Sequence, residues 1–391
     1  MSLALPGSPA DAAATYGLAA DEAAWVARGA ALARDSVAPL AAQWERERRL
    51  GHEALQAAAA LGLTGLQVPV QHGGLGASFA CKVALAEVLA GADFGLAMSW
   101  LNTHNVAAKL ARDAPAALAS RYLPELLAGR RLGCTALTEP GAGSDFAAIT
   151  TLATRCEGGW RISGAKAWIT NAAEADVVVL YAQTEPGSGG RGIACFLVDG
   201  QRAGFVREPA LALGGQHSIG AGGFRLEGYL ASTDELLHPP GQAFKAALVS
   251  INGARTYIAA MCCGMVGQAL RVAQAHGAQR HSFGQPLAGH QGWRWPLAEC
   301  ASELAACRLM VAQAARQIDA GQDTQLIAAQ AKLLACRLAD RQLPRLLQAM
   351  GAEGLREHHP FARHLMGARV AGFVDGSTEM LLERIGANLS R

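Results

Sequence analysis

Hydrophobic positions in the first third of the chain recur at helical spacing. One such stretch covers residues 21–37, a second covers residues 53–61 and ends before Gly62, and an Ala- and Leu-rich stretch covers residues 80–110. Ala and Leu favour the helix, and glycine commonly follows the last residue of a helix. The pattern predicts that residues 1–130 form an α-helical domain.

Beyond residue 133 the pattern changes. Short runs rich in β-branched and aromatic residues are separated by Gly, Pro, Ser and Asp, which is typical of strands joined by turns. The runs are residues 149–153, 160–162, 177–182, 193–198 and 224–226. Residues 186–190, Pro-Gly-Ser-Gly-Gly, predict an exposed hairpin loop. We therefore predict an antiparallel β domain over residues 131–240.

Helical spacing returns after residue 240. Residues 256–270 carry no charged side chain, as expected for a helix inside a bundle. In residues 324–348 the predicted core face consists of Ile327, Ala331, Leu334 and Leu338. Pro296 and Pro344 fall within helical patterns and are expected to kink or interrupt them. The pattern predicts a helical bundle over residues 241–391.

Composition and charge exclude several classes of function. Of the 391 residues, 51% are hydrophobic and 17% are charged, which excludes a disordered chain. The 34 basic and 32 acidic residues give a net charge of +2, which supplies no field for nucleic acid or an anionic membrane. The longest stretch without a charge, residues 54–81, contains Gln, His and Pro, so no membrane span is expected.

Cysteine and histidine spacing gives no support to a metal site. The 9 cysteines include no C-x-x-C pair, and the 11 histidines lack the spacing of metal ligands. We expect buried free thiols, no secretory signal and no bound metal, which together predict a soluble cytoplasmic protein.

The first candidate binding motif is Leu-Thr-Glu-Pro-Gly-Ala-Gly-Ser-Asp at residues 137–145. Three small residues, Gly141 to Gly143, allow backbone N–H groups to approach a ligand, and Ser144 adds a hydroxyl. Such a loop can hold a pyrophosphate, although small residues of this kind more often form only a tight turn. The spacing matches neither a P-loop nor a Rossmann fingerprint.

The second motif is Lys-Ala-Trp-Ile-Thr-Asn at residues 166–171. Trp168 and Thr170 are two residues apart, so both point to the same face of a regular strand. An indole ring beside a hydroxyl can line an isoalloxazine ring. Without further context, a tryptophan in a strand is more often a core residue.

Taken together, these motifs resemble signatures of the acyl-CoA dehydrogenase family of flavoproteins. Residues 138–145 match a Thr-Glu-x-x-Gly-Ser-Asp-type run, and residues 168–170 match a Trp-Ile-Thr element. Residues 280–287 with His-Gln at 290–291 resemble the family's Arg-x-x-Phe-Gly…Gln element, and residues 348–355 resemble its Gln-x-x-Gly-Gly-x-Gly stretch. The elements stand in the family's order along the chain.

The resemblance implies an α+β fold with an N-terminal helical domain, a middle antiparallel β domain and a C-terminal four-helix bundle. It also implies FAD bound between domains, in a homotetramer whose neighbouring subunit closes each site. The residues expected at FAD are Thr135, Leu137, Thr138, Gly143, Ser144, Trp168, Ile169, Thr170, Arg280, Ser282, Phe283, Gln291, Gln348, Gly351, Ala352, Ser377 and Glu379. Thr170 is expected near flavin N5, and Arg280 is expected to reach the neighbour's cofactor.

The family's reaction is the α,β-dehydrogenation of an acyl thioester, with an electron-transferring flavoprotein as acceptor. In most members a Glu near the C-terminus removes the α-proton, and Asp375 stands at that position here. In a minority of members the base precedes a helix arginine, but Ala254 stands there, before Arg255. The resemblance implies Asp375 as the base. The residues expected at the substrate are Ser144, Asn252, Arg255 and Gly376, while Glu139 and Asp145 are expected to brace the flavin loop.

Departures from the family pattern leave the substrate open. Nitroalkane oxidases share this fold and also use Asp as base, but Leu382 stands where their active-site arginine aligns, and Arg384 is two residues away. Ala352 and Asn252 differ from residues common in CoA-specific members, so an acyl-carrier-protein thioester is an alternative to acyl-CoA. A flavin-binding paralogue without turnover is a further alternative.

Overall fold

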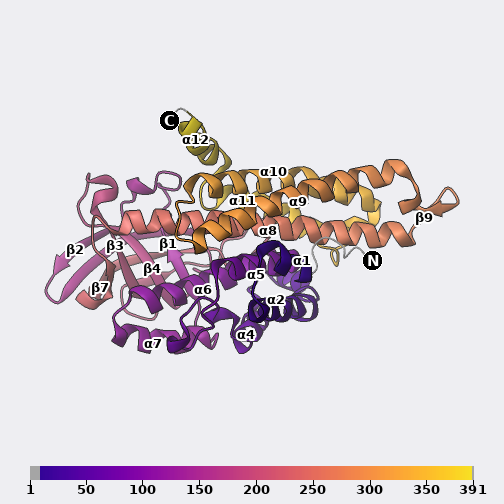
Figure 1. The fold of residues 1–391 in the computed structure, drawn as a ribbon. Helices are drawn as coiled ribbons and strands as arrows, with labels where there is room; N and C mark the ends of the chain where they lie inside the picture. The colour runs from indigo at the N-terminus through magenta and orange to yellow at the C-terminus, as the bar shows by residue number, and fades with distance from the viewer. Residues whose placement is uncertain (1–8, 390–391) are drawn as a thin grey trace.

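The structure is a computed structural model that describes residues 9–389. Figure 1 shows a β domain at one end of a long helical body. The N-terminal helices are α1 (Pro9–Tyr16), α2 (Ala20–Leu32), α3 (Ala41–Glu47), α4 (His52–Ala60), α5 (Phe79–Ala92), α6 (Phe94–Asp113) and α7 (Ala116–Leu127). The helices predicted in this part of the chain are confirmed, with a π-helical turn over Ala33–Val37 after α2.

Helices α5 and α6 form the buried centre of the N-terminal part. The Ser78 hydroxyl accepts a hydrogen bond from the N–H of Cys81 at 3.0 Å, and the Asp93 carboxylate accepts one from the N–H of Leu96 at 2.8 Å. These caps satisfy N–H groups that the first turn of a helix leaves free. Helix α5 is buried on nearly all sides because it packs between α2 and the long helix α8 (Ala243–Gln279).

The middle of the chain forms one eight-stranded sheet. Its strands are β1 (Gly133–Ala136), β2 (Leu152–Cys156), β3 (Gly159–Ile169), β4 (Val177–Gln183), β5 (Ile193–Asp199), β6 (Phe205–Arg207), β7 (Gly222–Ser232) and β8 (Leu236–His238). Most neighbours are antiparallel, as predicted, and residues 186–190 lie in the β4–β5 connection. The short strand β1, which the sequence pattern did not indicate, pairs with β4 in parallel, and β2 meets β4 at one parallel position.

The C-terminal part is a bundle of α8, α9 (Gln291–Asp319), α10 (Gln325–Met350) and α11 (Phe361–Phe373), followed by α12 (Thr378–Leu389). Of the kink or interruption expected at Pro296 and at Pro344, an interruption does not occur, because α9 and α10 continue through both prolines. Packing of the remaining helix face sustains the helix where one backbone hydrogen bond is lost.

The predicted core face of α10 is also only partly right. Ala331 and Leu338 are buried, but Leu334 is 37% exposed. The buried stripe instead includes Lys332, which has no exposed surface. This polar residue inside the bundle is important for the site described below.

Helix α8 is the central element of the bundle. By length and composition alone it could cross a membrane, but 72% of its most apolar window is buried inside the protein. It packs against α5, α9 and α10, so its apolar surface belongs to the core. After α8, the strands β9 (His281–Ser282) and β10 (Gln285–Pro286) form a small hairpin, which projects from the end of the bundle opposite the β domain (Figure 1).

Candidate active site

A buried ion pair anchors the loop at residues 137–145. The Nζ atom of Lys166 on β3 lies 2.8 Å from the Glu139 carboxylate and donates a second hydrogen bond to the carbonyl of Leu137 at 2.9 Å. Glu139 also accepts hydrogen bonds from the N–H groups of Thr150 and Thr151 at 2.6 and 2.9 Å. The prediction that Glu139 braces this loop agrees with these contacts.

The charges of this pair depend on one another. Burial would raise the pKa of Glu139, but the Lys166 ammonium and the hydrogen bonds hold it at about 2. Burial lowers the pKa of Lys166 to about 8, although Glu139 opposes this shift. Both groups are therefore charged at neutral pH, and removal of either would leave a buried charge unpaired.

The turn inside this loop leaves open space for a ligand. Glu139 and Ala142 exchange backbone hydrogen bonds at 3.0 and 3.1 Å, which closes a tight turn. A Cβ atom built on Gly141 or on Gly143 would meet nothing within 4 Å, and Ser144 is exposed. The backbone of this turn is thus accessible, as a site for an anionic group requires.

The second motif lies directly beside this loop, because the N–H of Ala167 donates to the carbonyl of Thr138 at 3.1 Å. Trp168 is exposed and Thr170 is half-buried, whereas Ile169 between them is buried, which agrees with the two side chains lying on one face. A register shift between residues 166 and 169 and a φ of 59° at Trp168 make this end of β3 irregular. Trp168 is 64% exposed, so it is not a core residue, and its ring is free to stack on a planar ligand.

Asp375 lies in a tight loop between α11 and α12, and two buried cations hold the backbone of this loop. Asp375 and Gly376 have φ of 53° and 99°, a region that favours glycine. Lys332 donates hydrogen bonds to the carbonyls of Val374 and, at 2.6 Å, of Gly376. Arg255 donates from Nε to the carbonyl of Asp375 at 3.0 Å. The predicted base is therefore positioned through its main chain.

The electrostatics of the loop suit a proton acceptor. Burial raises the pKa of the Asp375 carboxyl, and the charges of Lys332 and Arg255 oppose this shift. A base works best when its pKa lies near the working pH, so a raised value brings Asp375 closer to that condition. The sequence analysis assigned no role to Lys332. The only sign of such a role in the sequence is that this lysine stands next to the apolar face predicted for its helix.

The remaining residues predicted around the substrate lie close to this loop. Arg255 donates from Nη1 to the side-chain oxygen of Asn252 at 3.1 Å, which joins these two to Asp375. Ser377 accepts a weak hydrogen bond from the N–H of Met380 at 3.4 Å at the start of α12, and Glu379 is exposed in its first turn. The charge of Arg384 contributes to a lowered pKa of Arg255, so it too lies near this loop.

The other residues predicted at FAD form a separate group at the far end of the bundle. They are Arg280, Ser282, Phe283, Gln291, Gln348, Gly351 and Ala352. The indole N–H of Trp293 donates to the carbonyl of Ala349 at 3.1 Å, which ties the start of α9 to the end of α10. Phe283 is 96% exposed on the projecting hairpin.

The two groups are too far apart to share one cofactor within a single chain. Arg280 follows Arg255 by 25 residues along α8, which corresponds to about 38 Å at 1.5 Å per residue. The start of α8 lies against the β domain, where Phe244 stacks on Phe146 at 5.3 Å between ring centroids. The residues at 137–145 and Trp168 therefore lie near the start of α8, Asp375 lies beside Arg255 in the first half of this helix, and Arg280 lies at its far end.

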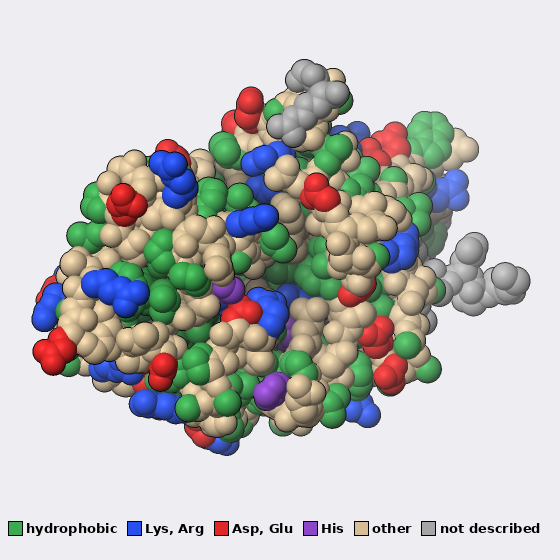
Figure 2. All heavy atoms as spheres, turned by 60° about the vertical axis from the view of Figure 1, so that its left-hand side comes forward, with side chains coloured by type: hydrophobic (Ala, Val, Ile, Leu, Met, Phe, Trp, Pro, Cys, Tyr) green, Lys and Arg blue, Asp and Glu red, His purple; other side chains and the backbone are tan. Residues whose placement is uncertain are grey.

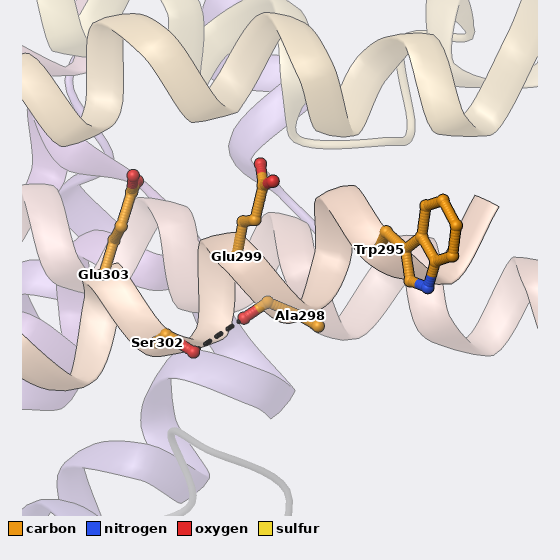
Figure 3. Close-up of a pocket in the computed structure, with 5 residues that line it drawn as sticks. All are labelled: Trp295, Ala298, Glu299, Ser302 and Glu303. Atoms are coloured by element: carbon orange, nitrogen blue, oxygen red, sulfur yellow. Dashed lines mark hydrogen bonds between the residues drawn. The ribbon is translucent and has the colours of Figure 1, made fainter. Parts of the chain in front are cut away.

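Two further observations concern the surface outside these groups. Figure 3 shows a depression along α9 lined by Trp295, Ala298, Glu299, Ser302 and Glu303, none of them a predicted site residue. On the face shown in Figure 2, basic, acidic and hydrophobic side chains are interspersed.

Among the residues that the structure describes, one group of side chains has ligand atoms close enough for a metal ion. Glu353, His358 and His359 place these atoms within 4.8 Å of one another. Glu353 also faces Arg356 at 3.4 Å, so a guanidinium competes for the same carboxylate.

Comparison with known proteins identifies the family. Models of the N-terminal, middle and C-terminal domains of acyl-CoA dehydrogenase match residues 19–130, 134–228 and 241–390. The chain is 31% identical over 362 residues to the mitochondrial short-chain specific acyl-CoA dehydrogenase of Homo sapiens, covering 90% of this chain and 86% of that protein.

Solved structures agree with this relationship. Butyryl-CoA dehydrogenase from Megasphaera elsdenii superposes with a TM-score of 0.91 at 27% identity, covering 96% of this chain and 99% of that one. A glutaryl-CoA dehydrogenase from Mycobacterium smegmatis in complex with FADH2 superposes with a TM-score of 0.89 at 25% identity, covering 95% of each chain. The chain belongs to the acyl-CoA dehydrogenase family and is an oxidoreductase that acts on CH–CH groups.

Proposed function

We propose that this protein is an FAD-dependent dehydrogenase that converts a saturated acyl thioester into its 2-enoyl product. The observation that carries the proposal is the loop of Asp375. A carboxylate with a raised pKa stands at the family's base position, and Arg255 and Lys332 fix its backbone without occupying the carboxylate. Such a group is suited to remove the α-proton of a bound thioester.

The residues of the β domain fit the flavin. The open turn at Gly141 and Gly143 offers backbone N–H groups to a pyrophosphate, and the exposed ring of Trp168 offers a flat surface beside it. Thr135, Leu137, Thr138, Ser144, Ile169 and Thr170 complete this group. When bound, FAD accepts the β-hydride of the substrate.

Within the chain, the proposed steps fall to a small set of residues. Asn252 and Arg255 lie beside the Asp375 loop and position the thioester. The backbone N–H of Gly376 donates to the thioester oxygen, where negative charge develops as the α-proton leaves. Asp375 takes this proton on its carboxylate. The proposed carrier is coenzyme A, with an acyl-carrier protein as the alternative.

The proposed assembly is a homotetramer, in which each flavin site is completed by the far end of a neighbouring bundle. Its support is the separation of about 38 Å between Arg255 and Arg280 along α8, together with the exposure of Phe283. Arg280, Ser282, Gln291, Gln348 and Ala352 would then contact the neighbour's cofactor. The proposed electron acceptor is an electron-transferring flavoprotein.

The experiment that tests this function is anaerobic reduction of the purified holoprotein. The panel contains acyl-CoAs, acyl-carrier-protein thioesters and nitroalkane anions, and flavin bleaching is followed by stopped flow. We expect a thioester to bleach the flavin and yield the 2-enoyl product. Bleaching by nitroethane anion alone would replace the proposal with nitroalkane oxidation, and bleaching by no member of the panel would favour a flavin-binding paralogue without turnover.

A further inference from the structure

The chain has five lysines, and the structure buries four of them. Three of these have strong partners. Lys109 pairs with Asp113 at 3.0 Å, Lys166 pairs with Glu139, and Lys332 donates to carbonyls of the Asp375 loop. The fourth, Lys82 on α5, is different.

Lys82 has a buried amino group without an anionic partner. It is 5% exposed, and Nζ donates one hydrogen bond of 2.6 Å to the side-chain oxygen of Asn105 on α6. The rings of Phe79 and Tyr257 lie 5.3 and 5.2 Å away. No carboxylate of the described residues forms an ion pair with Lys82, so two of its three N–H donors remain uncommitted.

This cluster lies next to the proposed substrate site. Phe79 packs against α8 at Gly253, where an added Cβ atom would stand 3.3 Å from its ring. Tyr257 follows Arg255 by two residues on the same helix and accepts a hydrogen bond from Asn105 at 3.3 Å. The negative charge of Asp375 contributes to the raised pKa of Tyr257, which shows that Asp375 is nearby.

The surroundings of Lys82 favour an anion. Burial lowers the pKa of Lys82 to about 7, and the charge of Arg112 adds to this shift. Burying a cation without a counter-charge is costly, and an arriving carboxylate would remove that cost. Phe79 and Tyr257 supply an apolar wall on which a methylene chain could lie.

We infer that Lys82 and Asn105 bind a carboxylate at the far end of the acyl group, so that the substrate is the mono-thioester of a dicarboxylic acid. This inference rests on the proposed function, because it names the substrate class of the same site. The thioester end lies at Asn252, Arg255 and Asp375, and the carboxylate end lies between α5, α6 and α8. An alkyl acyl group of equal length has no terminal carboxylate, so it would leave Lys82 without an anionic partner.

The test compares two series of CoA thioesters with the holoprotein. One series carries linear dicarboxylic acyl groups of roughly four to six carbons, and the other carries the matched alkyl groups. Flavin reduction and the apparent Kd are measured for wild type, for Lys82→Met and for the control Lys245→Met, which removes the exposed lysine at the start of α8. Flavin content and Tm verify that each variant folds.

We expect wild type to prefer a dicarboxylic thioester over its alkyl match by about 10- to 100-fold, the range for a hydrogen bond to a charged group. Lys82→Met should lose that preference while it keeps its rate with the alkyl series, and Lys245→Met should behave as wild type. If the alkyl series reduces the flavin of wild type as fast as the dicarboxylic series or faster, the inference is overturned and the proposed function is left intact. This comparison needs wild type only, so it holds even if Lys82→Met does not fold. An equal loss on both series in a folded Lys82→Met protein also overturns it. Reduction by no thioester overturns the inference and the proposed function together.

Discussion

The Nε atom of Arg255 donates a hydrogen bond to the backbone carbonyl oxygen of Asp375 at 3.0 Å. Because this contact uses the main chain, the carboxylate of Asp375 is left for substrate. Lys332 likewise donates hydrogen bonds to the backbone carbonyls of Val374 and Gly376. The candidate base is thus fixed by two cations that come from different helices, α8 and α10.

Lys332→Met should slow flavin reduction by about 10²-fold, since a small displacement of a reacting group has an effect of this size. The lost positive charge should also raise the pKa of Asp375 further, so the rise of the rate with pH should move to higher pH. Stopped-flow rates across pH test both effects. An unchanged pH profile would contradict the assigned contact, and Lys245→Met serves as the control.

Asp375→Asn should change stability in a direction set by the raised pKa of Asp375. A carboxyl whose pKa is higher in the folded state stabilises the fold below its unfolded pKa of about 3.9, and this contribution is lost as pH rises through the folded value. The amide has no charge to bury, so the variant should have a higher Tm than wild type at pH 7. The difference should vanish near pH 4. If Asp375→Asn has a lower Tm than wild type at pH 7 but not near pH 4, the argument that burial raises the pKa of Asp375 is contradicted.

Glu139→Gln should destabilise the β domain by about 3–5 kcal/mol, because it leaves Lys166 buried without its counter-charge. The double variant Glu139→Leu with Lys166→Met removes both charges and should be less destabilised. Chemical denaturation of the three proteins checks this order. Since the pKa of Glu139 is about 2, the pair should keep its contribution above pH 4.5 and lose it as pH falls towards 2. A double variant as unstable as the single one would show that the ion pair is not the cause.

Mixed oligomers test whether two chains share each flavin site. Gly143→Asp places a negative charge in the open turn without a clash, and Arg280→Glu reverses a charge at the other end of the bundle. Each variant alone should lose FAD. Co-expressed, they should form mixed pairs in which one of two sites combines two intact halves, so about half of the FAD should return in those pairs. No recovery in a purified mixed oligomer would contradict a shared site.

The sequence predicted much of this fold because its signals were local. Helical spacing marked α2, α4 and the α5–α6 region, and the motif at 137–145 indicated an open turn. What it missed depends on contacts between distant segments. The exposed position of Trp168 arises from the register of β3 against β7, and the role of Lys332 arises from a loop more than 40 residues away. Helix α10 continues through Pro344 because tertiary packing outweighs one lost hydrogen bond.

The most direct measurement is the anaerobic rate of flavin reduction in Asp375→Asn, with the thioester that reduces the wild type fastest. The variant keeps the size of the side chain and removes its basicity, so FAD content and the oxidised flavin spectrum should match wild type. Loss of a positioned base should lower the rate by about 10²–10⁴-fold, and Asp375→Glu should retain part of the activity. Reduction of Asp375→Asn at the wild-type rate would contradict the assignment of Asp375 as the base.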